Sequence, residues 1–297
     1  MPVFKQRSVL SGITVKEAMQ RQVVQLDSAV SIRQYVRHII KYKANAVLAT
    51  QAGHAPAGVV SKTDIMGAYY AGLPVETGIG DIMVGPPDTC LSTDTVEDAI
   101  DRMQTRKIHQ LYVRPEPDGP IVGQIEYSDI VGLLYRYCRT CTQGQRQPDG
   151  KADADMTRLS VKDVMSFDVA ACNPAEPISQ VMDVLSEHQL GAVLIASDDE
   201  AVGIISKTDL AVSYVKEIGI DTPAREIMKQ PVVSCHSDTL LSEAIQQMFL
   251  FDIQRIFVKT DPGQGIKGIL SLSDATRFRS GTCRVCGAGR LLDNPGI

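Results

Sequence analysis

Residues 203–210 read Gly-Ile-Ile-Ser-Lys-Thr-Asp-Leu, and residues 58–65 read almost the same, Gly-Val-Val-Ser-Lys-Thr-Asp-Ile. Two looser copies occur at residues 123–130 and 268–275. Each copy in the second half lies 145 residues after its counterpart in the first half. Similarity at a fixed offset is the signature of a repeated structural unit. The sequence therefore predicts one unit that occurs four times, in two pairs.

Each of the four copies contains the same order of predicted elements. A short helical signal ends in methionine at Met19, Met83, Met165 and Met228. A brief extended segment, an amphipathic helix and two β-branched strands follow, and a closing helix starts at the Ser-x-x-Asp. A unit of about 60 residues with two helices on a three-stranded sheet cannot cover its own apolar sheet face. We therefore expect the copies to pack in pairs.

This order of elements, with Gly-apolar-apolar-Ser/Thr-x-x-Asp at the last strand-to-helix junction, resembles the cystathionine β-synthase (CBS) domain. CBS domains occur in pairs called Bateman modules. The resemblance implies an α+β (α/β) fold with four CBS repeats, each a small three-stranded sheet with helices, paired into two Bateman modules related by pseudo-twofold symmetry. The expected modules are residues 8–136, with repeats 8–70 and 76–136, and residues 158–281, with repeats 158–215 and 221–281. Residues 137–157 are expected to form a Cys-x-x-Cys knuckle and a polar, flexible linker, and residues 282–297 a second knuckle and a tail.

Composition and charge narrow the choice of partners and compartment. Hydrophobic residues make up 44% of the chain and charged residues 22%, which is typical of soluble globular proteins. The net charge of −5 argues against a surface built to bind nucleic acid. No apolar run approaches the roughly 20 residues needed to cross a bilayer, and the first ten residues lack the apolar segment of a secretion signal. We therefore expect a cytoplasmic protein without a nucleic-acid or membrane partner.

The repeated Ser-x-x-Asp has a structural and a functional interpretation. As a capping box it satisfies backbone groups at a helix start and contributes about 1 kcal/mol. The same geometry can hold a ligand, because a carboxylate accepts ribose hydroxyls while helix N–H groups and a hydroxyl favour phosphate oxygens. The CBS resemblance implies this second use, with adenosine nucleotides as the usual ligands. The candidate residues are Ser61, Thr63, Asp64, Asp129, Ser206, Thr208, Asp209, Ser271 and Asp274.

The four candidate sites differ in charge. The second copy has Glu126 in place of the hydroxyl, and its negative charge would repel a phosphate, so this copy is the weakest candidate. Its segment 106–111 is similar to a phosphate-facing segment in the γ subunit of AMP-activated protein kinase, which implies a phosphate role for His109. Gln110 replaces the arginine of that segment, whereas the fourth copy has Arg255 at the matching place. With so few basic groups, a monophosphate or S-adenosylmethionine is favoured over ATP, although AMP, ADP and ATP are all candidate ligands.

Two Cys-x-x-Cys pairs follow the same 145-residue offset. They are Cys138 with Cys141 and Cys283 with Cys286, and each pair comes after the last helix of its predicted module and before a glycine. This local pattern is typical of a zinc knuckle, in which two thiolates bind one metal. Four thiolates suffice for a closed tetrahedral Zn²⁺ site, formed within one chain or across a homodimer.

Two other interpretations of the Cys-x-x-Cys pairs remain open. Arg139 and Arg284 would lower the pKa of the neighbouring thiols, so the pairs could act as redox dithiols. They could also be unligated surface cysteines. The other cysteines, Cys90, Cys172 and Cys235, are expected to be small buried core residues.

The function expected from these patterns is regulatory. The sequence contains no Gly-x-Ser-x-Gly, phosphate-loop or His-Glu-x-x-His motif, so we expect no catalysis. We expect a sensor that binds an adenosine-containing small molecule between paired CBS repeats and relays its occupancy to a regulated protein. The alternative is a thiol or metal redox protein, or a zinc-stabilised scaffold, that uses the two Cys-x-x-Cys pairs.

Overall fold

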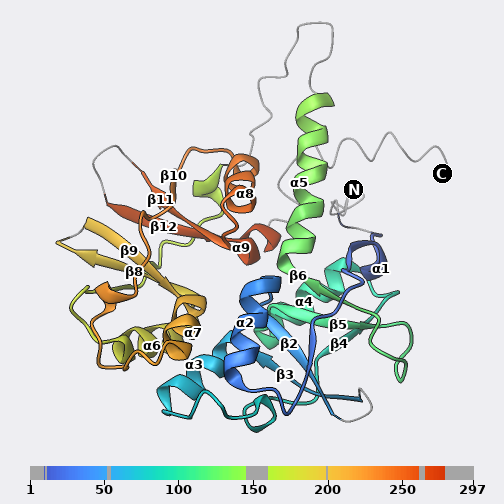
Figure 1. The fold of residues 1–297 in the computed structure, drawn as a ribbon. Helices are drawn as coiled ribbons and strands as arrows, with labels where there is room; N and C mark the ends of the chain where they lie inside the picture. The colour runs from blue at the N-terminus through green and yellow to red at the C-terminus, as the bar shows by residue number, and fades with distance from the viewer. Residues whose placement is uncertain are drawn as a thin grey trace, which may run out of the picture. The chain divides into compact units, whose positions relative to one another are not determined.

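The computed structural model describes residues 10, 12–51, 55–144, 160–198, 200–260 and 265–277, with side chains up to residue 136 in the helix that ends at residue 144 and up to residue 276 in the last helix. Four copies of one arrangement occur in this part of the chain (Figure 1). The first contains β1 (Gln25–Asp27), α2 (Ile32–Tyr42), β2 (Ala46–Gln51), β3 (Ala55–Ser61) and α3 (Lys62–Tyr70). The second contains β4 (Thr89–Leu91), α4 (Val96–Arg106), β5 (Gln110–Arg114), β6 (Gly123–Glu126) and α5 (Tyr127–Gly144).

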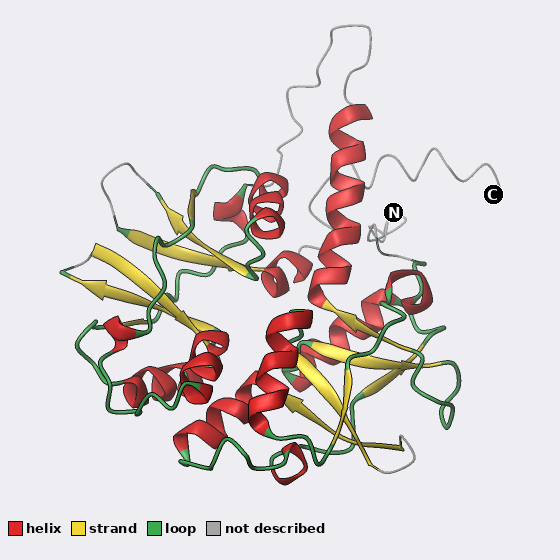
Figure 2. Ribbon diagram, in the orientation of Figure 1, coloured by secondary structure: helices red, strands yellow, loops and turns green. Residues whose placement is uncertain are grey.

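The second half of the chain repeats this arrangement. The third copy contains β7 (Ala171–Cys172), α6 (Ile178–Glu187), β8 (Ala192–Ser197), β9 (Glu200–Ser206) and α7 (Lys207–Val215). The fourth contains β10 (Ser234–His236), α8 (Leu241–Leu250), β11 (Arg255–Lys259), β12 (Ile266–Ser271) and α9 (Leu272–Arg277). Every copy forms a three-stranded sheet whose first two strands are parallel and whose last two are antiparallel (Figure 2). The predicted α+β fold with four small sheets is therefore confirmed.

A short leading segment precedes each copy and packs on a different copy from the one that it precedes. These segments are α1 (Val15–Ala18), η1 (Ile79–Asp81), η2 (Val161–Asp163) and η3 (Ala224–Glu226). The order of the sequence predicts that each segment belongs to the copy that follows it, but backbone bridges join each segment to the last strand of the other copy in the same half. The bridges are Gln20–Gln124, Val59–Val84, Ser166–Ile269 and Ile204–Lys229. Consecutive copies thus exchange their leading segments.

The exchange explains why the repeated motif begins with glycine and the leading segment ends with methionine. A Cβ atom at Gly203 would lie 2.7 Å from Sδ of Met228, and one at Gly268 would lie 2.7 Å from Sδ of Met165. Carbon and sulfur atoms do not approach this closely without displacement, so the methionine can pack on the strand only where the side chain is missing. The glycine of the repeated motif and the methionine of the leading segment are therefore the two sides of one contact.

The helices of the copies pack across the two halves of the chain. Contacts divide the chain into two compact units: unit 1 contains the second and fourth copies, and unit 2 contains the first and third. In unit 1, α5 packs on α8 and α9, and in unit 2, α7 packs on α2 and α3. Apolar residues of both copies form one core in unit 2, including Ile32 and Val36 from α2 and Val181 and Leu185 from α6. The prediction that consecutive copies pair into modules 8–136 and 158–281 depends on how unit 1 and unit 2 associate. It therefore stays a prediction.

A pair of stacked tyrosines lies where α3 and α7 pack in unit 2. The rings of Tyr69 and Tyr214 are 4.9 Å apart and inclined by 13°. The hydroxyl of Tyr69 donates to the carbonyl of Ile218 at 2.6 Å, and the hydroxyl of Tyr214 donates to the carbonyl of Leu73 at 2.5 Å. Both the donors and the acceptors are 145 residues apart, so the first and third copies pack about a local pseudo-twofold axis.

Two other buried tyrosines offer a matched test of the core. The hydroxyl of Tyr35 donates to the carbonyl of Val60 at 2.6 Å. The hydroxyl of Tyr112 makes no hydrogen bond of normal geometry to a described residue, although the side chain of Gln110 interacts with it and opposes the rise of its pKa on burial. The fourth copy has Phe257 at the position of Tyr112. A buried hydroxyl without a partner costs free energy, so Tyr112→Phe should raise the free energy of unfolding by about 1 kcal/mol and Tyr35→Phe should lower it by about 1 kcal/mol. Urea titration of both variants measures this, and a loss of stability in Tyr112→Phe would show that its hydroxyl is paired in solution.

Candidate functional site

The Ser-x-x-Asp residues of the first and third copies form capping boxes at the starts of α3 and α7. The backbone N–H and the hydroxyl of Ser61 both donate to Oδ2 of Asp64, each at 2.7 Å, and the N–H of Asp64 donates back to Oγ of Ser61 at 3.4 Å. In the third copy, Ser206 donates to Oδ2 of Asp209 through its N–H at 2.9 Å and its hydroxyl at 2.6 Å. The capping interpretation is therefore confirmed, and it uses one oxygen of each carboxylate.

The fourth copy adds a cation to the same arrangement. The N–H and hydroxyl of Ser271 donate to Oδ2 of Asp274 at 3.0 and 2.5 Å. Arg255 is the direct cross-strand partner of Ser271 in the sheet. Burial lowers the pKa of Arg255 to about 10, and the negative charge of nearby Asp274 acts in the opposite direction. Burial is the larger of these two effects, so the charge of Arg255 is poorly solvated.

In the second copy, other groups of the protein fill the cap. Oδ2 of Asp129 accepts from the backbone N–H of Glu126 at 2.8 Å, and Oδ1 accepts from Nε2 of Gln20 at 2.7 Å. The buried Glu126 carboxylate itself accepts from Nε2 of Gln124 at 3.1 Å. Burial raises the pKa of Asp129, and the two hydrogen bonds, from Gln20 and Glu126, lower it again. Both carboxylate oxygens are thus occupied by groups of the protein.

The caps of the first and third copies are joined by a lysine. Nζ of Lys207 donates to Oγ1 of Thr63 at 2.9 Å and so links the start of α7 to the start of α3. The equivalent Lys62 donates instead to Oδ1 of Asn45 in its own copy at 3.1 Å. The third copy has Gly191 at the place of Asn45, and a glycine offers no side-chain acceptor to hold Lys207.

Two further predicted site residues, His109 and Thr208, lie near the starts of α5 and α7. The exposed His109 lies beside Tyr127, the first residue of α5, with ring centroids 5.8 Å apart in an edge-on arrangement. Thr208 is half-buried at the second position of α7, the place that Thr63 holds in α3. Their predicted roles in ligand binding stay predictions.

The first Cys-x-x-Cys pair lies inside the last helix of its copy and not after it, where the sequence predicted it. Cys138 and Cys141 lie within α5, which continues to Gly144. Their side chains lie outside the described part of the structure, as do Cys283 and Cys286 altogether. Among the residues whose side chains are described, no group of three or more His, Cys, Asp or Glu side chains could hold a metal ion. The zinc site and the redox dithiol therefore stay predictions.

The other three cysteines are buried, as expected. The exposed fractions of Cys90, Cys172 and Cys235 are 3%, 4% and 8%. Burial raises the pKa of Cys90 to about 12 and those of Cys172 and Cys235 to about 11. These thiols remain protonated at neutral pH, as expected of core residues.

Two contributors to the caps were missed by the sequence analysis. Gln20 is the residue after the methionine of its leading segment, where the other segments have Val84, Ser166 and Lys229. That difference between repeats was a usable signal. Lys207 gave no signal, because the first copy has lysine at the same position, and only the packing of α7 on α3 brings Lys207 to the neighbouring cap.

A family model for the CBS domain matches residues 79–136, 161–216 and 224–281, which together make up more than half of the chain. The chain therefore belongs to the CBS-domain family. The first copy lies outside these matches but has the same sheet topology. Protein MK0525 from Methanopyrus kandleri is 33% identical over 122 residues, a match that spans 40% of this chain and 62% of that relative.

The solved structures of MJ1225 and of a Pyrococcus horikoshii protein share the fold of this chain. Protein MJ1225 from Methanocaldococcus jannaschii, described as a putative archaeal homolog of g-AMPK, is 18% identical, with a TM-score of 0.74 over 90% of this chain and 99% of that chain. A conserved protein from Pyrococcus horikoshii is 16% identical, with a TM-score of 0.57 over 89% of this chain and 99% of that chain. The CBS domain protein PAE2072 from Pyrobaculum aerophilum, complexed with AMP, is 25% identical over 43% of this chain and 99% of that chain, with a TM-score of 0.38. In the described part of our chain, no helix combines the length and apolar character needed to span a membrane.

Proposed function

We propose that this protein is a non-catalytic regulatory sensor that binds an adenosine-containing ligand at the caps of the first, third and fourth copies. The observation that carries the proposal is that the cap of the first copy and the cap of the third copy each use only one of the two carboxylate oxygens. Oδ1 of Asp64 and Oδ1 of Asp209 accept no hydrogen bond from any described residue. Such an oxygen can accept ribose hydroxyls, while the N-termini of α3 and α7 favour a negatively charged group.

The fourth copy is the proposed site for a ligand that carries a phosphate. Arg255 lies opposite Ser271 in the sheet, and its guanidinium can bind two phosphate oxygens at once. Burial has lowered the pKa of this group, so an anionic ligand would compensate a charge that is poorly solvated. AMP fits this chemistry best, because a single cation balances a monophosphate better than a triphosphate.

The second copy is proposed to remain without a ligand. Gln20 and the backbone of Glu126 occupy both oxygens of Asp129, and the Glu126 carboxylate adds a negative charge where a phosphate would approach. A ligand would have to displace these groups and overcome that charge. The protein would then have up to three ligand sites.

The exchanged leading segments provide the proposed route from ligand to partner. The strand that ends at Ser206 packs through Gly203 on Met228 of a leading segment. A ligand that stabilises the cap favours the arrangement in which this packing is complete. It does so because it binds that arrangement more tightly than one in which the packing is incomplete. We propose that the altered surface acts on a regulated protein, in a cytoplasmic homodimer.

The binding step can be tested by thermal unfolding with AMP, ADP, ATP and S-adenosylmethionine. A ligand at a hundredfold excess over its dissociation constant stabilises a protein by about 2.7 kcal/mol per site. Ser206→Ala with Asp209→Ala should abolish binding at the third copy and lower the stoichiometry measured by calorimetry by one site.

Ser160 and Asp163 provide the matched control, because they form the same box in a leading segment: Ser160 donates to Asp163 through its N–H at 2.8 Å and its hydroxyl at 2.7 Å. Ser160→Ala with Asp163→Ala should cost about as much stability, roughly 1–2 kcal/mol, and leave the stoichiometry unchanged. If none of the four ligands binds, or if both pairs of substitutions change binding equally, the assignment of the third cap fails.

Arg255→Gln, which introduces the residue of the second copy, tests the phosphate role. Because a hydrogen bond to a charged group contributes about 1.5–3 kcal/mol, the affinity of the fourth site for AMP should fall roughly ten- to hundredfold. Adenosine lacks the phosphate, so its affinity should change little. Calorimetry with both ligands separates these effects, and an equal loss for adenosine would show that Arg255 supports the fold rather than the phosphate.

A further inference from the structure

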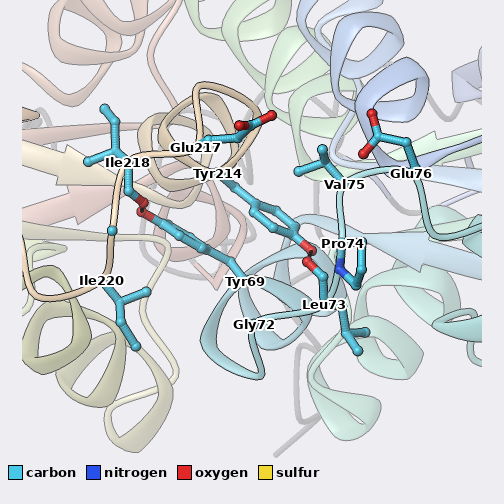
Figure 3. A pocket seen from close by; sticks show the side chains of 11 residues that line it. Tyr69, Gly72, Leu73, Pro74, Val75, Glu76, Tyr214, Glu217, Ile218 and Ile220 are labelled. Carbon is cyan, nitrogen blue, oxygen red and sulfur yellow. Dashed lines mark hydrogen bonds between the residues drawn. The ribbon is translucent and has the colours of Figure 1, made fainter.

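A cavity of about 440 Å³ lies in unit 2, on the local pseudo-twofold axis and apart from the caps. It is lined by Tyr69, Tyr214 and the loop residues 72–76 and 217–220, which follow α3 and α7 (Figure 3). Its volume is within the range of small-molecule sites in proteins, about 300–1,000 Å³. The caps are at the opposite ends of the same two helices, so this cavity is not part of the proposed adenosine sites.

The walls of the cavity are held by hydrogen bonds on both sides of the axis. The stacked tyrosines donate to the carbonyls of Leu73 and Ile218 in the opposite loops. Each loop also holds the start of a helix: the N–H of Arg33 donates to the carbonyl of Val75, and the N–H of Ser179 donates to that of Ile220, both at 2.9 Å. The cavity is therefore preformed, which reduces the ordering cost of binding.

Two carboxylates and no cationic side chain line the cavity. The side chains of Glu76 and Glu217 are 67% and 69% exposed, and Figure 3 shows both carboxylates along one edge of the cavity. Arg33, from outside the lining, pairs with both: Nε lies 3.0 Å from Oε1 of Glu76 and Nη2 lies 2.7 Å from Oε1 of Glu217. One positively charged guanidinium thus pairs with two negatively charged carboxylates. This edge of the cavity therefore keeps a net negative charge.

The duplication does not supply a second cation. Ser179 holds the place in α6 that Arg33 holds in α2, as their matched backbone bonds show. A serine cannot neutralise a carboxylate. The apolar part of the lining is formed by Leu73, Pro74, Val75, Ile218 and Ile220.

We propose that this cavity binds a small organic cation with an apolar body, such as an alkylammonium or arylalkylammonium ion. The aliphatic walls and the tyrosine pair would cover the apolar body, and the cationic group would pair with Glu76 and Glu217. The bridge made by Arg33 shows that the two carboxylates lie close enough to share one cation. Both lining loops lead directly into the leading segments η1 and η3, so a bound cation would act on the chain that connects consecutive copies.

Calorimetry on the full-length protein with benzylamine, benzyl alcohol and benzoate tests this proposal. The three probes share one ring and differ in charge. Benzylamine should bind, benzyl alcohol should bind about fivefold more weakly or worse, and benzoate should not bind. Equal binding of the amine and the alcohol would overturn the proposal, because the apolar walls alone would then account for it.

Substitutions then locate the site. Glu76→Gln with Glu217→Gln keeps the side-chain volume and should weaken benzylamine binding about fivefold or more, whereas Glu187→Gln, at the exposed end of α6 in the same unit, should leave it unchanged. Arg33→Met removes the competing guanidinium and should strengthen binding. Unchanged binding in the double variant, or weaker binding in a folded Arg33→Met protein, would contradict the assignment.

Discussion

The packing of α7 on α3 is the contact on which unit 2 depends. A three-stranded sheet with two helices is too small to bury its own apolar surface, and the core of unit 2 contains residues from both halves of the chain, such as Ile32 and Ile178. The stacked Tyr69 and Tyr214 lie where the two copies meet, and each hydroxyl is satisfied by a loop of the opposite copy. Neither half can therefore complete this core alone. Unit 1 is built in the same way, with α5 on α8 and α9.

Duplication has produced equal frameworks and unequal sites. The three Ser-x-x-Asp caps share the same hydrogen bonds, yet each has different neighbours. Arg255 gives one cap a cation, Lys207 crosses to another, and Gln20 closes the remaining cap of the second copy. Each difference comes from one side chain on a strand, helix or leading segment that all four copies contain. Sites can diverge in this way without disturbing the fold, because the backbone contacts remain the same.

Much of the fold could be predicted because repeated local signals determine it. Four strand–helix junctions with the same spacing indicated four sheets. The Ser-x-x-Asp motif indicated helix caps, because the hydrogen bonds of a capping box join residues only three positions apart. The exchange of leading segments could not be predicted, because the contact of Met228 with Gly203 depends on tertiary packing. The role of Lys207 has the same origin.

The first cysteine pair shows the opposite case, because its position relative to the helix differs from the position that the local pattern predicts. Cys-x-x-Cys before a glycine is typical of a knuckle, but Cys138 and Cys141 continue the helix that starts at Tyr127. Helix propagation over 18 residues prevailed over the turn signal of a single glycine, Gly144. The cavity on the axis of unit 2 also had no sequence signature, because its lining residues come from two loops far apart in the chain.

Each compact unit is built from both halves of the chain. A protease site placed between residues 145 and 159 would allow the folded protein to be cut into its two halves, and native mass spectrometry would then measure their association. We predict that the two fragments remain together as a one-to-one complex at low-micromolar concentration, because α3 on α7 and α5 on α9 both cross the cut. Separation into two independently folded fragments would contradict the account.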